Sequence, residues 1–233
     1  MHKGNVYLIP TVLHEDALHT IAPYIVDAIQ QCAVFYVEND KTARRFFKKV
    51  WPQMVIDDYE WLVIHKAETQ CIAAFERHLK AGKNVGIVSE AGCPGVADPG
   101  QVLVAVAQQL LAVVKPLVGP NSILLALMAS GMNGQRFQFH GYLPIDSGER
   151  KKSIQSIEEY SIRQQCTQIF IETPYRNNQL LKDLLQVCKS STQLCVAVDI
   201  TATSESIVTK SIAVWKQSQP DIHKRLAIFL LAG

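Results

Sequence analysis

The most informative stretch of this chain reads Ser89-Glu90-Ala91-Gly92-Cys93-Pro94-Gly95-Val96-Ala97-Asp98-Pro99-Gly100. It follows a short apolar run, Val85–Val88, which predicts a buried parallel strand, and it precedes a helical pattern that begins near Gln101. Gly and Ala let a ligand approach the backbone closely, and Pro holds a loop in one shape. Because open α/β proteins bind ligands at the carboxyl ends of parallel strands, this pattern predicts a ligand loop rather than a simple surface turn.

On both sides of this loop, strand-like apolar runs alternate with helical patterns, which is typical of an α/β protein. In the first half the expected strands are Val6–Ile9, Val34–Val37 and Val85–Val88. The expected helices there span about Asp16–Gln31 with a kink near Pro23, Lys41–Val50, Glu68–Ala81 ending at Gly82, and a segment from Gln101.

The second half has more closely spaced strand-like runs, and some neighbours leave no room for a crossover helix. We therefore expect two α/β lobes, residues 1–115 with a mostly parallel sheet and residues 116–233 with a mixed sheet. The boundary is expected where Val113–Val118, a strand or linker, leads into Gly119-Pro120-Asn121-Ser122. The later strands are expected at 137–142, 168–172, 194–200, 206–211 and 226–231, and long helices at 148–165 and 176–189.

Composition limits the class of protein. The chain has 233 residues, 48% hydrophobic and 19% charged, which suffices for a substantial core and is unlike a disordered chain. The formal net charge of +2 neither demands nor excludes a nucleic-acid partner. The longest apolar stretch, Val102–Val114, is too short to span a bilayer, and the amino terminus leads directly into a strand, so we expect a cytoplasmic protein without a signal peptide or membrane contact.

The six cysteines are scattered without a CxxC pair, so the sequence predicts neither a zinc site nor a dithiol redox site. We expect reduced, mostly buried thiols and no bound metal. Cys93 lies inside the loop, where we expect a small packing residue rather than a reactive thiol. No GxGxxG follows the first strand, no phosphate-binding GxxxxGK[ST] is present, and His14 and His19 are five residues apart, unlike a zinc-protease helix.

Four clusters of small residues follow apolar strands and predict one ligand held between the two lobes. They are Pro10-Thr11, the loop at 89–100, the turn at 119–122 and Thr201-Ala202-Thr203.

Charged residues give a weaker pattern. The second expected helix carries four cations, Arg44, Arg45, Lys48 and Lys49, which form like-charged pairs at i and i+4. Bound phosphate would relieve the repulsion within these pairs. A solvated helix face explains the four cations equally well. Arg150-Lys151-Lys152 is a possible extension of this patch. Each of four carboxylates near strand ends is suited either to binding and proton transfer or to a structural role: Glu38, Glu90, Asp98 and Glu172.

Several ordered motifs resemble those of the tetrapyrrole methylase superfamily, the class III S-adenosylmethionine-dependent methyltransferases. The closest likeness is to the branch that 2′-O-methylates a cytidine of small-subunit ribosomal RNA. The likeness covers nearly the whole chain, and it is carried by Val6–Thr11, Glu38–Lys41, Val88–Gly100, Pro116–Ser122, Arg136–Pro144 and Ile171–Arg176.

This chain departs from the family pattern in three places. Val12-Leu13-His14-Glu15 replaces Ile-Gly-Asn-Leu, Glu90 replaces an aspartate, and Glu38-Asn39-Asp40-Lys41 replaces Glu-Asp-Thr-Arg. The last change is not neutral for phosphate binding, because lysine lacks the fork of arginine. These changes fall around the expected acceptor side, so they bear on the substrate more than on the fold or the methyl donor.

The resemblance implies S-adenosylmethionine as cofactor, with S-adenosylhomocysteine as product, in the cleft between the lobes. The residues that it implies for the donor site are Pro10, Ser89, Glu90, Ala91, Gly92, Cys93, Val96, Asn121, Ser122, Ile171 and Ala202. The cations Arg44, Arg45, Lys48 and Lys49 would bind RNA, and Glu38 is the first candidate for a general base.

The resemblance also implies a homodimer, with ribosomal RNA or the small ribosomal subunit as partner. Two alternatives remain open. One is a methyltransferase acting on a small corrin or porphyrin precursor, which needs no basic patch. The other is a non-catalytic protein that binds the methyl donor as a sensor.

Overall fold

The computed structural model describes residues 3–64 and 68–233, and the chain divides into two compact units, Met1–Asn121 and Ser122–Gly233. The boundary predicted after residue 115 lies a little before the boundary in the structure, which follows Asn121. The difference arises because Val114–Pro116 forms strand β5 and pairs with the first strand of the chain, which ties it to the first unit.

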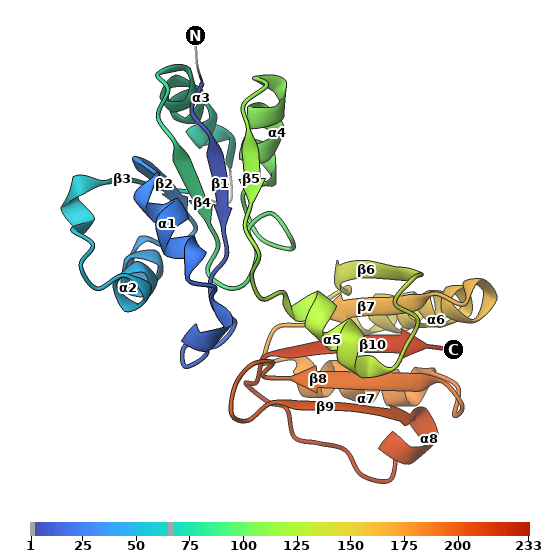
Figure 1. Cartoon of the computed structure of the whole chain (residues 1–233). Helices are drawn as coiled ribbons and strands as arrows, with labels where there is room; N and C mark the ends of the chain where they lie inside the picture. Colours follow the sequence, from blue (N-terminus) through green and yellow to red (C-terminus); the bar gives the residue numbers. More distant parts are fainter. Residues whose placement is uncertain (1–2, 65–67) are drawn as a thin grey trace. The chain divides into compact units, whose positions relative to one another are not determined.

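The first unit contains a five-stranded sheet in the order β3-β2-β4-β1-β5. Every pair in it is parallel. The strands are β1 (Val6–Ile9), β2 (Val34–Val37), β3 (Glu60–Val63), β4 (Val85–Val88) and β5 (Val114–Pro116). Since β4 lies between β1 and β2, the loops that follow these strands emerge side by side at one edge of the sheet (Figure 1).

Helices cover both faces of this sheet, and each face has its own buried core. On one face, Phe75 and Leu79 of α3 and Leu103 of α4 pack against strand residues. On the other face, Ile25 of α1 and Phe47 of α2 do so. The helices of this unit are η1 (Leu18–Thr20), α1 (Tyr24–Gln30), α2 (Asp40–Val50), η2 (Ile56–Asp58), η3 (Glu68–Cys71), α3 (Ile72–Lys80) and α4 (Gln101–Gln109).

Two helices of the first unit differ from expectation. Instead of one kinked helix over 16–31, a 3-10 turn is followed by α1, which begins directly after Pro23. Proline has no N–H to donate and its fixed φ suits a helix start, so it begins the helix rather than bending it. The helix expected from Glu68 begins as a 3-10 turn and becomes α-helical at Ile72. The short edge strand β3 was not predicted.

The second unit has a mixed sheet in the order β6-β7-β10-β8-β9. Only β6 and β7 are parallel, and the other three pairs are antiparallel, as the strand spacing predicted. The strands are β6 (Phe137–Tyr142), β7 (Thr167–Ile171), β8 (Gln193–Val198), β9 (Ser206–Ser211) and β10 (Ala227–Ala232).

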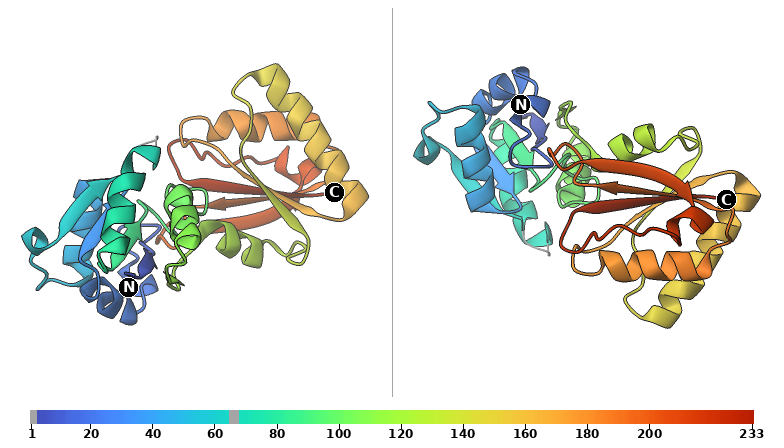
Figure 2. Two further views of the ribbon diagram at one scale, coloured as in Figure 1. Left: turned by 90° about the horizontal axis from the view of Figure 1, so that it is seen from above. Right: turned by 90° about the horizontal axis from the view of Figure 1, so that it is seen from below.

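Helices α6 (Ser147–Gln164) and α7 (Asn177–Val187) cover one face of this second sheet, over a core that includes Phe170 and Phe229. Helix α5 (Ser122–Ser130) packs against β8, β9 and β10. Both views of Figure 2 place α5 on the opposite face from α6 and α7. A short helix, α8 (Ile212–Trp215), follows β9 and was not predicted.

Candidate active site

The loops after β1 and β4 are joined by backbone hydrogen bonds. The Thr11 N–H donates to the Gly92 carbonyl at 2.9 Å, and the Gly92 N–H donates to the Thr11 carbonyl at 3.2 Å. The Thr11 hydroxyl also donates to the carbonyl of Ser89, and the Ser89 hydroxyl donates to that of Gly92. These bonds hold the predicted ligand loop in one conformation next to Pro10.

The turn after β5 packs against Pro10 in the same region, and position 119 of this turn requires glycine. A Cβ added to Gly119 would lie 2.1 Å from Cβ of Pro10, so no side chain fits there. Gly92 has φ +75° and a Cβ on it would lie 3.2 Å from the Pro120 carbonyl oxygen. The small residues therefore serve close packing of three strand ends, and they bring the predicted residues Pro10, Gly92 and Cys93 together.

Cys93 is a packing residue in this cluster, as expected. Its thiol donates to the carbonyl of Pro120 at 3.5 Å and to that of Gly119. Burial raises the pKa of this thiol, so Cys93 stays protonated at neutral pH and is a poor nucleophile. All six cysteines are free, and the other five are buried. Ala91 and Val96 are exposed and present a small apolar surface of the loop.

Three of the predicted donor residues belong to the second unit. Ser122 is the first residue of α5, Ile171 ends β7, and Ala202 lies in the turn that follows β8. Because β10 lies between β7 and β8, and Ile171 pairs with Ile228 next to the pair of Ala227 with Val198, Ile171 and the turn after β8 lie near one edge of this sheet. Thr201 in this turn has φ +74°, a costly conformation for a β-branched residue.

The carboxylates after β2 and β4 are brought together, although no local pattern predicts this. The Glu38 Oε2 atom accepts from the backbone N–H of Glu90 at 3.1 Å. The Thr42 hydroxyl donates to Glu90 Oε1, also at 3.1 Å. Burial, followed by the charges of Glu38 and Glu90, raises the pKa of Asp98 to about 6. The sequence analysis considered each carboxylate by itself. Their position after neighbouring parallel strands is the signal from which their proximity could have been predicted.

Glu172 and Arg150 each form an ion pair within the second unit. Glu172 is buried and forms an ion pair with Arg176 at 2.6 Å. Arg150 does not extend a basic patch, which corrects our expectation. It is only 4% exposed and pairs with the buried carboxylate of Asp183 at 2.6 Å. Arg150 also donates to the carbonyl of Ile145, so its charge holds α6 against α7.

Most of the predicted RNA-binding cations on α2 are engaged by the protein itself. Arg44 forms an ion pair with Asp40 at 2.6 Å and lies over the Trp61 ring. Lys48 donates to the carbonyls of Pro52 and Met54. Lys49 donates to the Glu15 carbonyl at 3.4 Å. Within residues 3–64 and 68–233, Arg45 has neither a hydrogen-bond nor an ion-pair partner, so all the donors of its guanidinium are available to a ligand.

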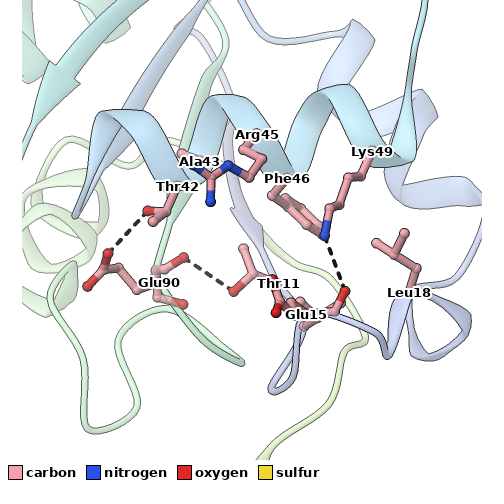
Figure 3. A pocket seen from close by; sticks show the side chains of 11 residues that line it. Thr11, Glu15, Leu18, Thr42, Ala43, Arg45, Phe46, Lys49 and Glu90 are labelled. Carbon is pink, nitrogen blue, oxygen red and sulfur yellow. Dashed lines mark hydrogen bonds between the residues drawn. The ribbon is translucent and has the colours of Figure 1, made fainter. Parts of the chain in front are cut away.

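Arg45 lines a pocket of about 170 Å³ in the first unit (Figure 3). One wall is α2, which begins after Asn39, whose side chain caps the helix by accepting from two backbone N–H groups. The other walls are the segment after β1 and the start of the loop after β4. The pocket is lined by Thr11, Val12, Glu15, Leu18, Thr42, Ala43, Arg45, Phe46, Lys49, Ser89 and Glu90. Sequence reasoning missed Glu15, Thr42 and Phe46 as members, because their approach depends on how α2 packs.

Comparison with known proteins identifies the family. The ribosomal RNA small subunit methyltransferase I of Vibrio cholerae is 30% identical to this chain over 231 residues, which cover 98% of this chain and 77% of that protein. The chain belongs to the ribosomal RNA small subunit methyltransferase I family. The protein of that name from Pseudomonas aeruginosa is 27% identical over 237 residues, covering 100% of this chain and 80% of that protein. No protein-family model matches the sequence.

Solved structures agree with this family in fold. The methyltransferase CobJ superposes with a TM-score of 0.64 at 15% identity, covering 100% of this chain and 95% of that one. A uroporphyrin-III C-methyl transferase from Thermus thermophilus, solved with S-adenyl homocysteine, gives a TM-score of 0.59 at 15% identity, with 98% and 97% covered. The predicted resemblance to the tetrapyrrole methylases, and the two-sheet α/β fold that it implied, are confirmed.

The described part of the chain contains neither a cluster of metal ligands nor a candidate membrane-spanning helix. Among residues 3–64 and 68–233, no three His, Cys, Asp or Glu side chains are grouped so that they could hold a metal ion. No helix of that same part has both the length and the apolar character needed to cross a lipid bilayer. The homodimer and the cytoplasmic location stay predictions.

Proposed function

We propose that this chain transfers a methyl group from S-adenosylmethionine to the ribose 2′-oxygen of a cytidine in small-subunit ribosomal RNA. The observation that supports this most strongly is the 30% identity over 231 residues to a ribosomal RNA small subunit methyltransferase. The tetrapyrrole alternative rests on structural neighbours at 15% identity, a level that carries the fold and not the substrate.

The first unit supplies a suitable surface for the methyl donor. When bound, S-adenosylmethionine supplies an electrophilic methyl group on a positively charged sulfur. Pro10, Ala91, Gly92, Cys93 and Val96 would hold it, and their tight backbone packing keeps that surface rigid. All five are uncharged, and the thiol of Cys93 stays protonated. Since the sulfonium charge disappears during transfer, an uncharged surface avoids stabilising the ground state over the transition state.

Orientation is the main work required of the protein. Displacement at a methyl carbon needs the acceptor oxygen in line with the bond that breaks, and positioning alone can supply several kcal/mol. A general base then contributes only part of the remainder. Glu38 stays our first candidate for this base, although one of its oxygens accepts the N–H of Glu90. Glu38→Gln tests it, because glutamine cannot take up the ribose proton.

A methyl-transfer panel tests the proposed function. The purified protein is incubated with donor carrying a radiolabelled methyl group and with unmethylated small ribosomal subunits, naked ribosomal RNA, or corrin and porphyrin precursors. We expect label in ribosomal RNA only. Transfer to a tetrapyrrole, or donor binding without transfer to any acceptor, would contradict the proposal in favour of one of its two alternatives.

A matched pair of variants tests the donor surface by calorimetry with S-adenosylhomocysteine. Ala91→Trp places a bulky ring on the exposed loop and should abolish binding. Ala81→Trp is the control, because Ala81 is also exposed but follows α3 at the opposite edge of the sheet. Equal affinities in the two variants would remove Ala91 from the site.

A further inference from the structure

The pocket beside α2 contains a free cation and a fixed anion. Arg45 is exposed, and Figure 3 shows its guanidinium extending from α2 toward the side of the pocket where Thr11 and Glu90 lie. Glu90 is held at two points, because its carboxylate accepts from Thr42 and its backbone N–H is bound by Glu38. A donor group and an acceptor group thus face one space, and the acceptor is preorganised.

The rest of the lining is largely apolar. Val12 and Leu18 come from the segment after β1, and the buried ring of Phe46 comes from α2. Flat apolar ligands with a polar edge suit such a wall, because their faces contact hydrocarbon while their edge meets the charged groups. The carboxylates of Glu15 and Glu90 balance the charges of Arg45 and Lys49 in this lining, so the pocket has no excess of positive charge that would favour a phosphate group.

The chemistry of cytosine matches this arrangement. Its Watson–Crick edge carries an N4 amino donor beside the N3 and O2 acceptors, so a carboxylate and a guanidinium can both be satisfied. Uracil has a carbonyl in place of the amino group, and it would set two acceptors against each other.

Building on the proposed function, we propose that this pocket binds the cytosine base of the acceptor nucleotide, with Glu90 accepting from N4 and Arg45 donating to N3 or O2. This assigns Glu90 to the acceptor rather than to the methyl donor.

The pocket is also in the right place within its unit. Its wall residue Thr11 is bound to Gly92 by two backbone hydrogen bonds, and Ser89 and Glu90 directly precede the proposed donor residues Ala91 and Gly92. A base in the pocket therefore lies beside the proposed donor surface, because the loop after β4 contributes to both. Proteins that recognise single-stranded RNA commonly bind an unstacked base through its Watson–Crick edge in this way.

Binding of two RNA fragments tests this inference. Each spans the methylated nucleotide, with cytidine or uridine at that position, and fluorescence anisotropy measures affinity at several salt concentrations with S-adenosylhomocysteine present. For the wild-type protein we expect about tenfold tighter binding of the cytidine fragment, in line with one good base-edge pair. Arg45→Ala should lose this preference without changing the salt slope, because it removes a base contact and not a phosphate contact.

Glu90→Gln and a control complete the design. An amide both accepts and donates, so Glu90→Gln should bind the uridine fragment better and reduce the preference to about twofold. Lys41→Ala is the matched control, since Lys41 is an exposed cation of α2 outside the pocket lining. It should leave the ratio between the fragments unchanged.

The outcomes separate the inference from the function on which it rests. If the wild-type protein makes no 2′-O-methylcytidine, the proposed function is wrong. If it does, but Arg45→Ala weakens both fragments equally and lowers the salt slope by about one, then Arg45 binds a phosphate and the base assignment is wrong. An unchanged preference in both Arg45→Ala and Glu90→Gln would also overturn it.

Discussion

The hydroxyl of Thr42 donates to Glu90 Oε1 at 3.1 Å, a bond that it shares with the Asn39 carbonyl at the same distance, and it joins the first turn of α2 to the loop after β4. Thr42 and Glu90 are 48 positions apart in the chain. With the bond from the Glu90 N–H to Glu38, it makes the ends of β2 and β4 a single rigid element. The orientation of Glu90 in the pocket thus depends on groups that would not themselves contact the acceptor.

Replacing Thr42 should weaken acceptor binding without unfolding the protein. Thr42→Val removes one hydrogen bond to a carboxylate at an exposed position, so we expect about a fivefold loss of affinity for the cytidine fragment. Thr42→Ser keeps the hydroxyl and should restore binding. Anisotropy measures both variants, and a wild-type affinity in Thr42→Val would contradict the role assigned to the hydroxyl.

Asp98 should make stability depend on pH. Its pKa is raised to about 6, whereas in the unfolded chain it is about 3.9. Between these values the folded protein keeps a proton that the unfolded chain has lost, so the free energy of unfolding falls as pH rises through this window. Asp98→Asn lacks this fall. Because Asp98 is partly exposed and solvent screens its charge, we expect the variant to be only about 1 kcal/mol more stable than wild type near neutral pH.

Thermal melting of wild type and Asp98→Asn across this range measures the effect. The two curves should converge near pH 4, where both side chains are neutral. A constant offset at every pH would show that the substitution acts through packing and not through the charge of Asp98.

Arg150 should be essential for the stability of the second unit. Both members of its ion pair with Asp183 are at least 95% buried, so Arg150→Ala leaves a carboxylate without its partner. We expect a loss of about 3 kcal/mol in urea unfolding. The exposed neighbour Lys152 provides the control, and Lys152→Ala should change stability by less than about 0.5 kcal/mol. Similar effects of the two substitutions would contradict the assignment of Arg150 to the core.

Gly119 should not tolerate a side chain. A Cβ there meets Pro10, so Gly119→Ala must push the turn after β5 away from the segment after β1, which is itself bonded to Gly92 through Thr11. We expect about 1–3 kcal/mol of lost stability, together with weaker binding of S-adenosylhomocysteine. Gly134→Ala is the control, because no heavy atom lies within 4 Å of a Cβ at that position. Unchanged donor binding in Gly119→Ala would separate this turn from the donor site.

The sequence predicted the alternating architecture well, because buried strands such as Val34–Val37 and Val85–Val88 are continuous apolar runs. It failed where one residue has two possible effects, as with Pro23, which begins α1 instead of bending a longer helix. β3 was missed because this edge strand is only partly buried and begins with Glu60, so its apolar pattern is short.

Some features of the candidate site could be predicted from the sequence, and others could not. The glycine-rich loop could be predicted because its backbone needs are local. The ion pair of Arg44 with Asp40 also has a local signal, because the two residues are four apart on one helix. The roles of Arg45 and Arg150 could not be predicted, because only tertiary packing places Arg45 in the pocket and Asp183 beside Arg150. The pairing of Thr42 with Glu90 has no local signal, since it depends on the order of β2 and β4 in the sheet.

The most direct test of the central claim is nucleoside mass spectrometry of small-subunit ribosomal RNA after incubation with this protein and a donor whose methyl group is deuterated. The account predicts a labelled cytidine with the heavy methyl group on the ribose, formed by the wild-type protein and not by Ala91→Trp. A heavy methyl group on a base, on a ribose other than that of cytidine, or on no nucleoside at all would contradict it.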